Sequence, residues 1–166
     1  MDEELVIYPD RLTDKPTVFE GTVDLEEFPR LEESLADGRI DLKYKVIARL
    51  DKQRRKVVSC IIEGFVFLTC QTTLEAFRHG ISIDDRLVLV DEESQLPPIE
   101  GESDAEDYLV ADGPLDVLDL VEDAVLLALP MVPRKPGLDE GREAGVAKEP
   151  RASPFATLAS LKKRPL

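Results

Sequence analysis

The sequence predicts an α+β fold: a largely antiparallel sheet of four to five strands, two packed helices and a short helical C-terminal tail. Residues 40–50 alternate between apolar and polar side chains, and a polar turn and a second apolar stretch at 57–70 follow them. Alternation with period two is typical of a strand with one buried face, so the two stretches are expected to pair across the turn. Apolar residues recur at helical spacing in 25–36 and 116–129, which predicts two amphipathic helices.

Composition divides the chain into three parts. Its 166 residues are enough for one domain with appendages. The segment after the second helix is rich in proline and glycine, which is typical of a linker. We therefore expect an α+β domain at 1–133, a flexible linker at 134–152 and an amphipathic basic tail at 153–166.

The first predicted elements are a strand and a helix. Residues 17–23 are rich in β-branched and aromatic types, which favour a strand. Asp24 is a suitable N-cap for a helix over 25–36, and Pro29 stands near the first turn, where a helix tolerates proline. The apolar face of this helix consists of Leu25, Phe28, Leu31 and Leu35.

The middle of the chain predicts the centre of the sheet. The stretch at 57–70 is apolar on both faces, which predicts a central strand that is covered on both sides. Gly64 inside it suggests a β-bulge. A further strand region covers 74–90. We expect a break in it at one of two places, His79-Gly80 or Asp84-Asp85.

The C-terminal third begins with an acidic segment. Residues 91–107 carry many carboxylates and two adjacent prolines, which predicts a solvated loop. A short strand at 108–110 follows. The helix at 116–129 has acidic residues near its start and ends at Pro130, because proline disfavours helix in the residue before it.

The overall charge limits the possible functions. The chain has 35 acidic and 21 basic residues, a net charge of −14, which opposes the approach of nucleic acid and suits a basic protein partner or simple solubility. No apolar run reaches the length of a transmembrane helix, and the acidic N-terminus does not resemble a secretory signal. We expect a soluble, cytoplasmic protein.

No group of residues predicts catalysis. Cys60, Cys70 and His79 are the only soft metal ligands, fewer than a structural zinc site uses, and nothing in their spacing makes His79 a base for either cysteine. Glycine-rich phosphate loops and nucleophile motifs are absent from the sequence. We expect a non-enzymatic protein with no catalytic residue, no metal and no cofactor.

One segment reverses the charge of the chain. Residues 39–56 hold eight cationic side chains against two carboxylates, a local charge of +6. Parity places part of the set on one face of the strand at 40–50 and the rest in the turn after it. These residues are our candidates for RNA binding: Lys43, Lys45, Arg49, Lys52, Arg54, Arg55 and Lys56. The alternative is a solvated sheet face that the neighbouring acidic loop partly neutralises.

The C-terminal tail carries a second candidate surface. Ser153 and Pro154 suit the start of a short helix, which cannot be stable alone and must dock on its own domain or on a partner. The candidates for this docking are Phe155, Leu158, Leu161, Lys162 and Lys163.

Two stretches resemble the YceD family, also called large ribosomal RNA subunit accumulation protein. The first is an acidic helix with Glu122 that runs into Leu127-Ala128-Leu129-Pro130 and a second proline, Pro133. The second is the ending Pro154-Phe155-Ala156-Thr157-Leu158-Ala159-Ser160-Leu161-Lys162, which looks like the close of the proteobacterial branch. The family commonly has a Cys-x-x-Cys pair, of which this chain keeps Cys70 and has Thr73 in the second place, so the resemblance implies no metal or redox role here.

The resemblance implies a part in large-subunit biogenesis and 23S ribosomal RNA accumulation. We expect the chain to bind precursor ribosomal RNA or a large-subunit assembly intermediate, with no membrane and no small-molecule substrate. The alternative is an acidic chaperone that binds a basic ribosomal protein.

Overall fold

The computed structural model describes residues 5–98 and 106–137. Met1–Arg134 forms one compact unit. Most of the expected linker at 134–152 and all of the expected tail at 153–166 lie outside the described residues. None of the helices that are described is long and apolar enough to cross a membrane.

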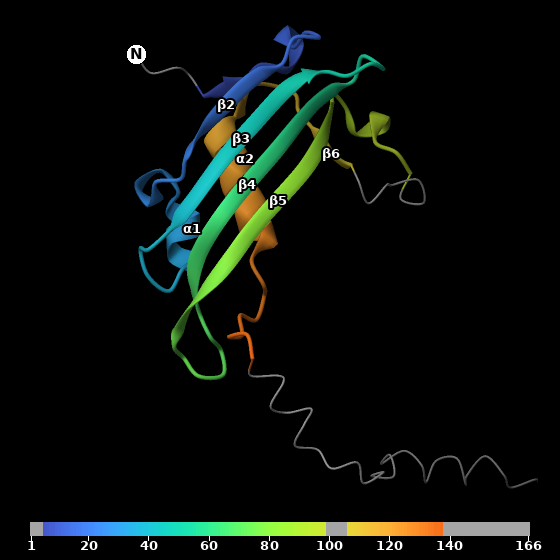
Figure 1. Cartoon of the computed structure of the whole chain (residues 1–166). Coiled ribbons are helices and arrows are strands. Elements are labelled where there is room, and N and C mark those ends of the chain that lie inside the picture. Colours follow the sequence, from blue (N-terminus) through green and yellow to red (C-terminus); the bar gives the residue numbers. More distant parts are fainter. Residues whose placement is uncertain (1–4, 99–105, 138–166) are drawn as a thin grey trace, which may run out of the picture. The chain divides into compact units, whose positions relative to one another are not determined.

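The predicted α+β fold with a largely antiparallel sheet is confirmed (Figure 1). The sheet strands are β2 (Thr17–Thr22), β3 (Asp41–Leu50), β4 (Lys56–Thr69), β5 (Ala76–Val90) and β6 (Asp107–Val110). They lie in this order across the sheet, and every pair is antiparallel except β5 with β6, which is parallel. A separate pair of short strands, β1 (Val6–Ile7) and β7 (Leu115–Asp116), was not predicted.

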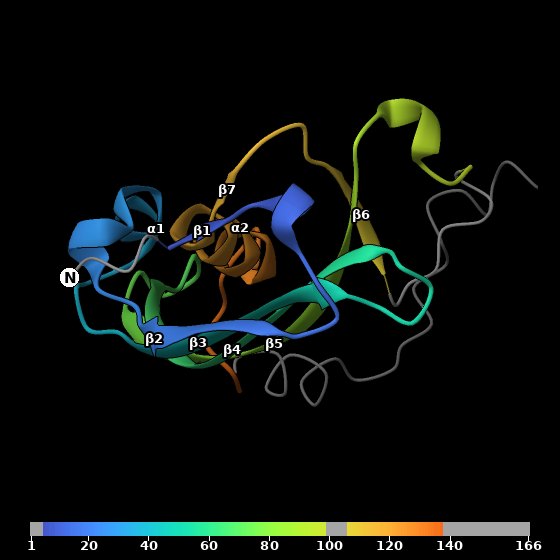
Figure 2. The ribbon, with the colours of Figure 1, turned by 90° about the horizontal axis from the view of Figure 1, so that it is seen from above.

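The helices lie on one face of the sheet (Figure 2). They are α1 (Pro29–Ser34) and α2 (Val117–Ala128), and short 3₁₀ turns occur at Pro9–Arg11, Leu25–Glu27 and Glu93–Gln95. Val117, Val121 and Val125 of α2 are fully buried against the sheet and its neighbours. The opposite face of the sheet, called the open face below, carries no helix among the described residues.

Alternation along β3 decides which side chains enter the core. Leu42, Tyr44, Val46 and Ala48 are buried, and Lys43, Lys45 and Arg49 on the other parity are exposed. This confirms the predicted half-buried strand. The predicted helix at 116–129 is also confirmed, as α2. Asp116 caps it by accepting hydrogen bonds from the backbone N–H groups of Leu118 and Asp119.

The predicted continuous helix at 25–36 is wrong. Phe28 has φ −127° and ψ 67°, outside the helical region, and separates the 3₁₀ turn from α1. The cause is Pro29, whose ring disfavours helical geometry in the residue before it. Asp24 caps the 3₁₀ turn, and both Phe28 and Leu31 are completely buried.

Two predictions for the central strands are also wrong. Strand β5 is continuous from Ala76 to Val90, because it pairs with β4 over its length and His79 and Asp84 remain in register. Gly64 is not a bulge, since the pairing with β3 continues on both of its sides. It has φ +143°, and a Cβ atom there would overlap the carbonyl oxygen of Asp41. Glycine is therefore required by conformation and by close approach of the backbones.

Strand β4 is central, as predicted, but among the described residues only its helix-facing side is covered by another layer. On the open face Ile61, Phe65 and Phe67 are half-buried. Arg39 lies over the ring of Phe67 and Arg78 over that of Phe65, which explains how this face can carry aromatic residues without a covering layer.

Candidate nucleic-acid interface

The predicted RNA-binding residues fall on β3, on the β3–β4 turn and on the start of β4. We call residues 43–56 the basic hairpin. Lys43, Lys45 and Arg49 project from the open face of β3. The Nζ atom of Lys45 lies 3.9 Å from Oε2 of Glu20, a long and exposed contact that contributes little.

Asp51 fixes the shape of the turn. Its Oδ1 atom accepts hydrogen bonds from the backbone N–H groups of Gln53 and Arg55, each at 2.9 Å. The N–H group of Arg55, and then its side chain, hold the pKa of Asp51 below its ordinary value. Arg54 takes a left-handed conformation with φ 62°, and it projects with Lys52 into solvent.

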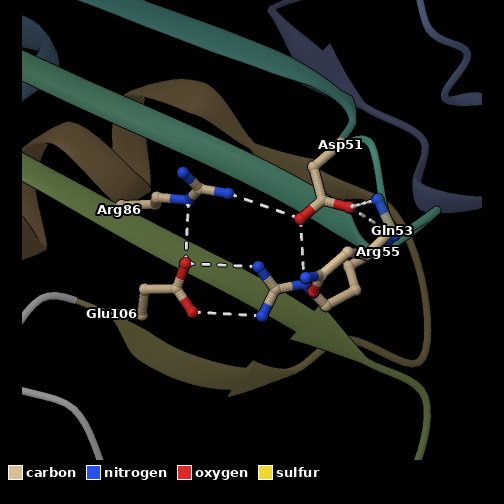
Figure 3. Close-up of polar contacts among 5 residues, drawn as sticks. All are labelled: Asp51, Gln53, Arg55, Arg86 and Glu106. Atoms are coloured by element: carbon tan, nitrogen blue, oxygen red, sulfur yellow. Dashed lines mark hydrogen bonds and ion pairs between the residues drawn. The ribbon is translucent and has the colours of Figure 1, made fainter.

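A closed set of ion pairs stands beside the turn (Figure 3). Arg55 donates to Oδ2 of Asp51 at 2.8 Å and to both carboxylate oxygens of Glu106 at 3.1 and 3.3 Å. Arg86 of β5 reaches Oδ2 of Asp51 at 3.4 Å, and its Nε atom lies 3.2 Å from Oε1 of Glu106, outside hydrogen-bond geometry. The hydrogen bonds that Arg55 donates to Glu106 and Asp51 raise the pKa of its guanidinium group. The network therefore ties the turn to β5 and to the start of β6.

The same residues line a hollow with a volume of about 560 Å³. Five cationic side chains contribute to its lining: Arg49, Lys52, Arg54, Arg55 and Arg86. Only two carboxylates do so, Asp14 and Asp51. Such an excess of guanidinium and ammonium groups suits an anion, and guanidinium groups match the geometry of phosphate oxygens.

The seven candidates differ in whether an ion pair within the protein already neutralises their charge. Within residues 5–98 and 106–137, four have no ion pair: Lys43, Arg49, Lys52 and Arg54. Arg55 belongs to the network, and Lys56 is bound to Asp10 at 3.1 Å and Asp91 at 2.8 Å. These two residues therefore hold the hairpin in place, and the first four are available for a ligand.

Sequence reasoning missed Arg86, Asp51 and Glu106 as parts of this surface. Arg86 follows two aspartates in the chain, outside the basic segment at 39–56. Its place is set by the register of β4 with β5, where it pairs with Ser59. Only knowledge of that register could have placed it beside the turn.

The other residues that the sequence analysis singled out either lie outside the described part of the chain or are buried. Phe155, Leu158, Leu161, Lys162 and Lys163 lie outside the described residues. Cys60 and Cys70 are buried, and burial raises the pKa of Cys60 to about 11. Within the described part of the chain, no three histidine, cysteine or carboxylate side chains are grouped as metal ligands.

The chain matches a known protein family. The sequence model of the family described as "Large ribosomal RNA subunit accumulation protein YceD" matches residues 58–162, more than half of the chain. No solved structure matches the chain.

Proposed function

The chain belongs to the YceD family of large ribosomal RNA subunit accumulation proteins, and on that premise we propose that it acts without catalysis, by binding precursor ribosomal RNA or a large-subunit assembly intermediate. Membership links it to the accumulation of large-subunit ribosomal RNA. The basic hairpin is the surface that we assign to the binding.

One observation carries the proposal: Lys43, Arg49, Lys52 and Arg54 are exposed and lack ion pairs among the described residues, in a chain of net charge −14. An unpaired surface cation releases a counterion from RNA when it contacts a phosphate. The network of Asp51, Arg55, Arg86 and Glu106 holds the turn rigid, so little ordering of the backbone is required on binding.

Reversal of charge in the hairpin tests the proposal. Arg49→Glu with Arg54→Glu should weaken binding of precursor RNA in a filter or gel-shift assay, because two phosphate contacts are lost. The dependence of log K on log salt should become shallower by about 0.7 for each lost contact with a single strand. Adding Lys43→Glu and Lys45→Glu should weaken binding further.

A matched control keeps the change in net charge constant. Arg11→Glu with Lys15→Glu alters two exposed cations outside the hairpin by the same amount. The control should bind RNA nearly as well as the wild type. Equal losses in the two double variants, or no loss in either, would rule out the hairpin as the RNA site.

A second candidate function is an acidic chaperone for a basic ribosomal protein. The observation that favours it is the net charge of −14, which attracts a basic partner over long range. It requires that a ribosomal protein remain bound to the tagged chain after nuclease treatment. Loss of every such partner with the RNA would exclude it.

A further inference from the structure

A second cluster of side chains on the open face lies outside the basic hairpin. Phe65 and Phe67 stand next to each other on β4, with ring centroids 6.0 Å apart and an interplanar angle of 84°. The Cζ atom of Arg39 lies 4.1 Å from the centroid of Phe67, and that of Arg78 lies 4.1 Å from the centroid of Phe65. Two guanidinium planes therefore cover two aromatic rings; we call these four residues the stacking platform.

Arg39 is held in place from two sides. Its Nε and Nη2 atoms donate to the carboxylate of Asp37, at 3.1 and 2.8 Å, while its guanidinium lies over Phe67. The side chain remains 68% exposed, so it is fixed and still open to solvent. A shallow hollow of about 580 Å³ contains the cluster, with Gly38 and Ile40 at its edge.

Fixed guanidinium and aromatic planes on a sheet are surfaces on which nucleobases stack. Stacking on the protein contributes most binding free energy for bases that are not already stacked on each other, as in a single strand. In an A-form duplex the base faces are buried inside the helix, and a flat sheet can touch only phosphate and ribose. The chemistry of the platform therefore favours single-stranded RNA over duplex RNA.

The platform and the basic hairpin occupy the two ends of one face. Strand pairing places the side chains of Lys43 and Lys45 between the platform and the turn of the basic hairpin. A third hollow, of about 540 Å³, lies on the same stretch, and its lining includes these two lysines, Ile61 and the carboxylates of Glu20 and Glu63. The ten residue steps from Phe67 back to Val57 span about 33 Å of extended strand, room for several nucleotides.

Carboxylates limit where phosphates can lie on this face. Asp41 is exposed opposite Phe65, and Glu63 is exposed opposite Lys43, so a phosphate is disfavoured next to the platform and contact there must come from bases. Lys43, Lys45 and Arg49 follow one another along β3 and offer the path for the RNA backbone. Base contacts at one end and phosphate contacts at the other are thus complementary to one strand of RNA.

We propose that the open face is a binding site for single-stranded RNA, whose bases stack on the guanidinium planes of Arg39 and Arg78 above Phe67 and Phe65, and whose backbone follows β3 to the turn of the basic hairpin. The inference rests on the proposed RNA-binding function and names its substrate class. The inference requires base stacking, which the basic hairpin does not supply. Stacking and phosphate binding can therefore be tested separately.

The test compares RNA forms and paired variants by fluorescence anisotropy with the full-length chain. A short single-stranded RNA should bind more tightly than a hairpin duplex of the same length. Arg39→Gln with Arg78→Gln, and separately Phe65→Leu with Phe67→Leu, should weaken binding of the single strand by about tenfold and change duplex binding little. The leucine pair should leave the salt dependence unchanged, because it removes no charge.

The chain offers a matched control for these variants. Arg11 lies over the ring of Tyr8, with Cζ 4.6 Å from the centroid, away from the open face. Arg11→Gln with Tyr8→Leu removes one cation–aromatic pair of the same kind and should leave RNA affinity unchanged. Urea unfolding of each variant verifies that it is folded, and the exposed arginine pair keeps the test valid where the leucine pair loses stability.

A second readout reports stacking directly. Replacement of an adenine in the RNA by 2-aminopurine gives a base whose emission falls when it stacks on another plane. We expect the emission to fall on binding to the wild type and to fall much less on binding to the leucine pair. Equal quenching in both would overturn the inference.

The outcomes separate the inference from the proposed function. If the wild type binds RNA, the hairpin reversal weakens it and both platform variants bind single strands like the control, the inference fails and the proposed function stands. If the wild type binds no RNA, both fail. If the platform variants lose a nuclease-resistant protein partner and keep full RNA affinity, the open face is a protein-binding site and the inference is wrong.

Discussion

Among the described residues, Glu122 is the buried carboxylate on which the packing of the two helices depends. Its Oε1 atom accepts a hydrogen bond from the backbone N–H of Leu31 at 3.0 Å, and its Oε2 atom accepts from Nε of Arg30 at 2.8 Å. Leu31 is completely buried, so its N–H group has no access to water as a substitute. Glu122 thus provides an acceptor at the start of α1 that the short helix cannot supply itself.

We predict that Glu122→Ala lowers the free energy of unfolding by about 2–3 kcal/mol, because it leaves a buried donor unsatisfied and opens a small cavity. Glu122→Gln keeps an acceptor for Leu31 and should cost less. Urea denaturation followed by circular dichroism measures both. Asp123→Asn is the control, since Asp123 makes an exposed pair with the same Arg30. A loss for Asp123→Asn as large as that for Glu122→Ala would contradict this account.

The thiol of Cys60 gives the protein an alkaline pH dependence. Burial, and secondly the negative charge of Asp85, raise its pKa from 9.0 to about 11. Between these values the folded protein keeps a proton that the unfolded chain has lost, so stability falls as pH rises. The wild type should lose up to about 2–3 kcal/mol over this range from Cys60. In Cys60→Ala the decline should be shallower, and parallel stability curves for the two proteins would refute the assignment.

At the residue scale, sequence parity predicted part of the site and missed the rest. Period two correctly placed Lys43, Lys45 and Arg49 opposite the buried side chains of β3. Glu122 was expected to favour the start of its helix through its charge and to form part of the stretch that resembles the family. Its real partners stand about ninety residues earlier in the chain, and helical periodicity contains no information on which helices meet.

Gly64 decides how closely two elements, β3 and β4, approach each other. Its φ of +143° is disfavoured for any residue with a side chain, and an added Cβ would overlap the Asp41 carbonyl group. Gly64→Ala should therefore cost at least about 3 kcal/mol or prevent folding, as thermal unfolding would show. Gly80 in β5 is the control, because an added Cβ meets nothing within 4 Å and φ is not positive. Similar melting temperatures for the two alanine variants would disprove the close approach.

At the scale of elements, the strands were easier to predict than their ends and neighbours. Strong alternation in β3 and the long apolar stretch of β4 identified the centre of the sheet. The polar residues of β5 suggested breaks, because an isolated strand would not include them. The pairing with β4 keeps β5 continuous, and Arg78, Ser82 and Asp84 lie on the side of the sheet that no helix covers among the described residues. That openness is a tertiary fact, which local pattern could not supply.

At the scale of the whole molecule, a net charge of −14 and a site for RNA are compatible only if the site is local. At physiological salt the Debye length is about 8 Å, so carboxylates farther away are largely screened from a phosphate bound at the hairpin. Carboxylates in the ion-pair network beside the turn are too close to such a phosphate to be screened. Glu106 is the clearest case, since it contacts both Arg55 and Arg86, which line the same hollow.

We therefore predict that Glu106→Gln increases RNA affinity by about fivefold at low salt, because it removes a competing negative charge within a few ångströms of the site. Asp51 still holds Arg55 and Arg86, so the turn should keep its shape.

Glu92→Gln makes the same change in net charge at an exposed residue outside the hollow and should alter affinity little. Filter binding over a series of salt concentrations measures the difference, which should shrink as salt rises. If Glu92→Gln increased affinity as much as Glu106→Gln, the global field rather than the basic hairpin would govern binding. A loss of affinity in Glu106→Gln would mean that the network is needed intact, and that its arginines act only to hold the turn.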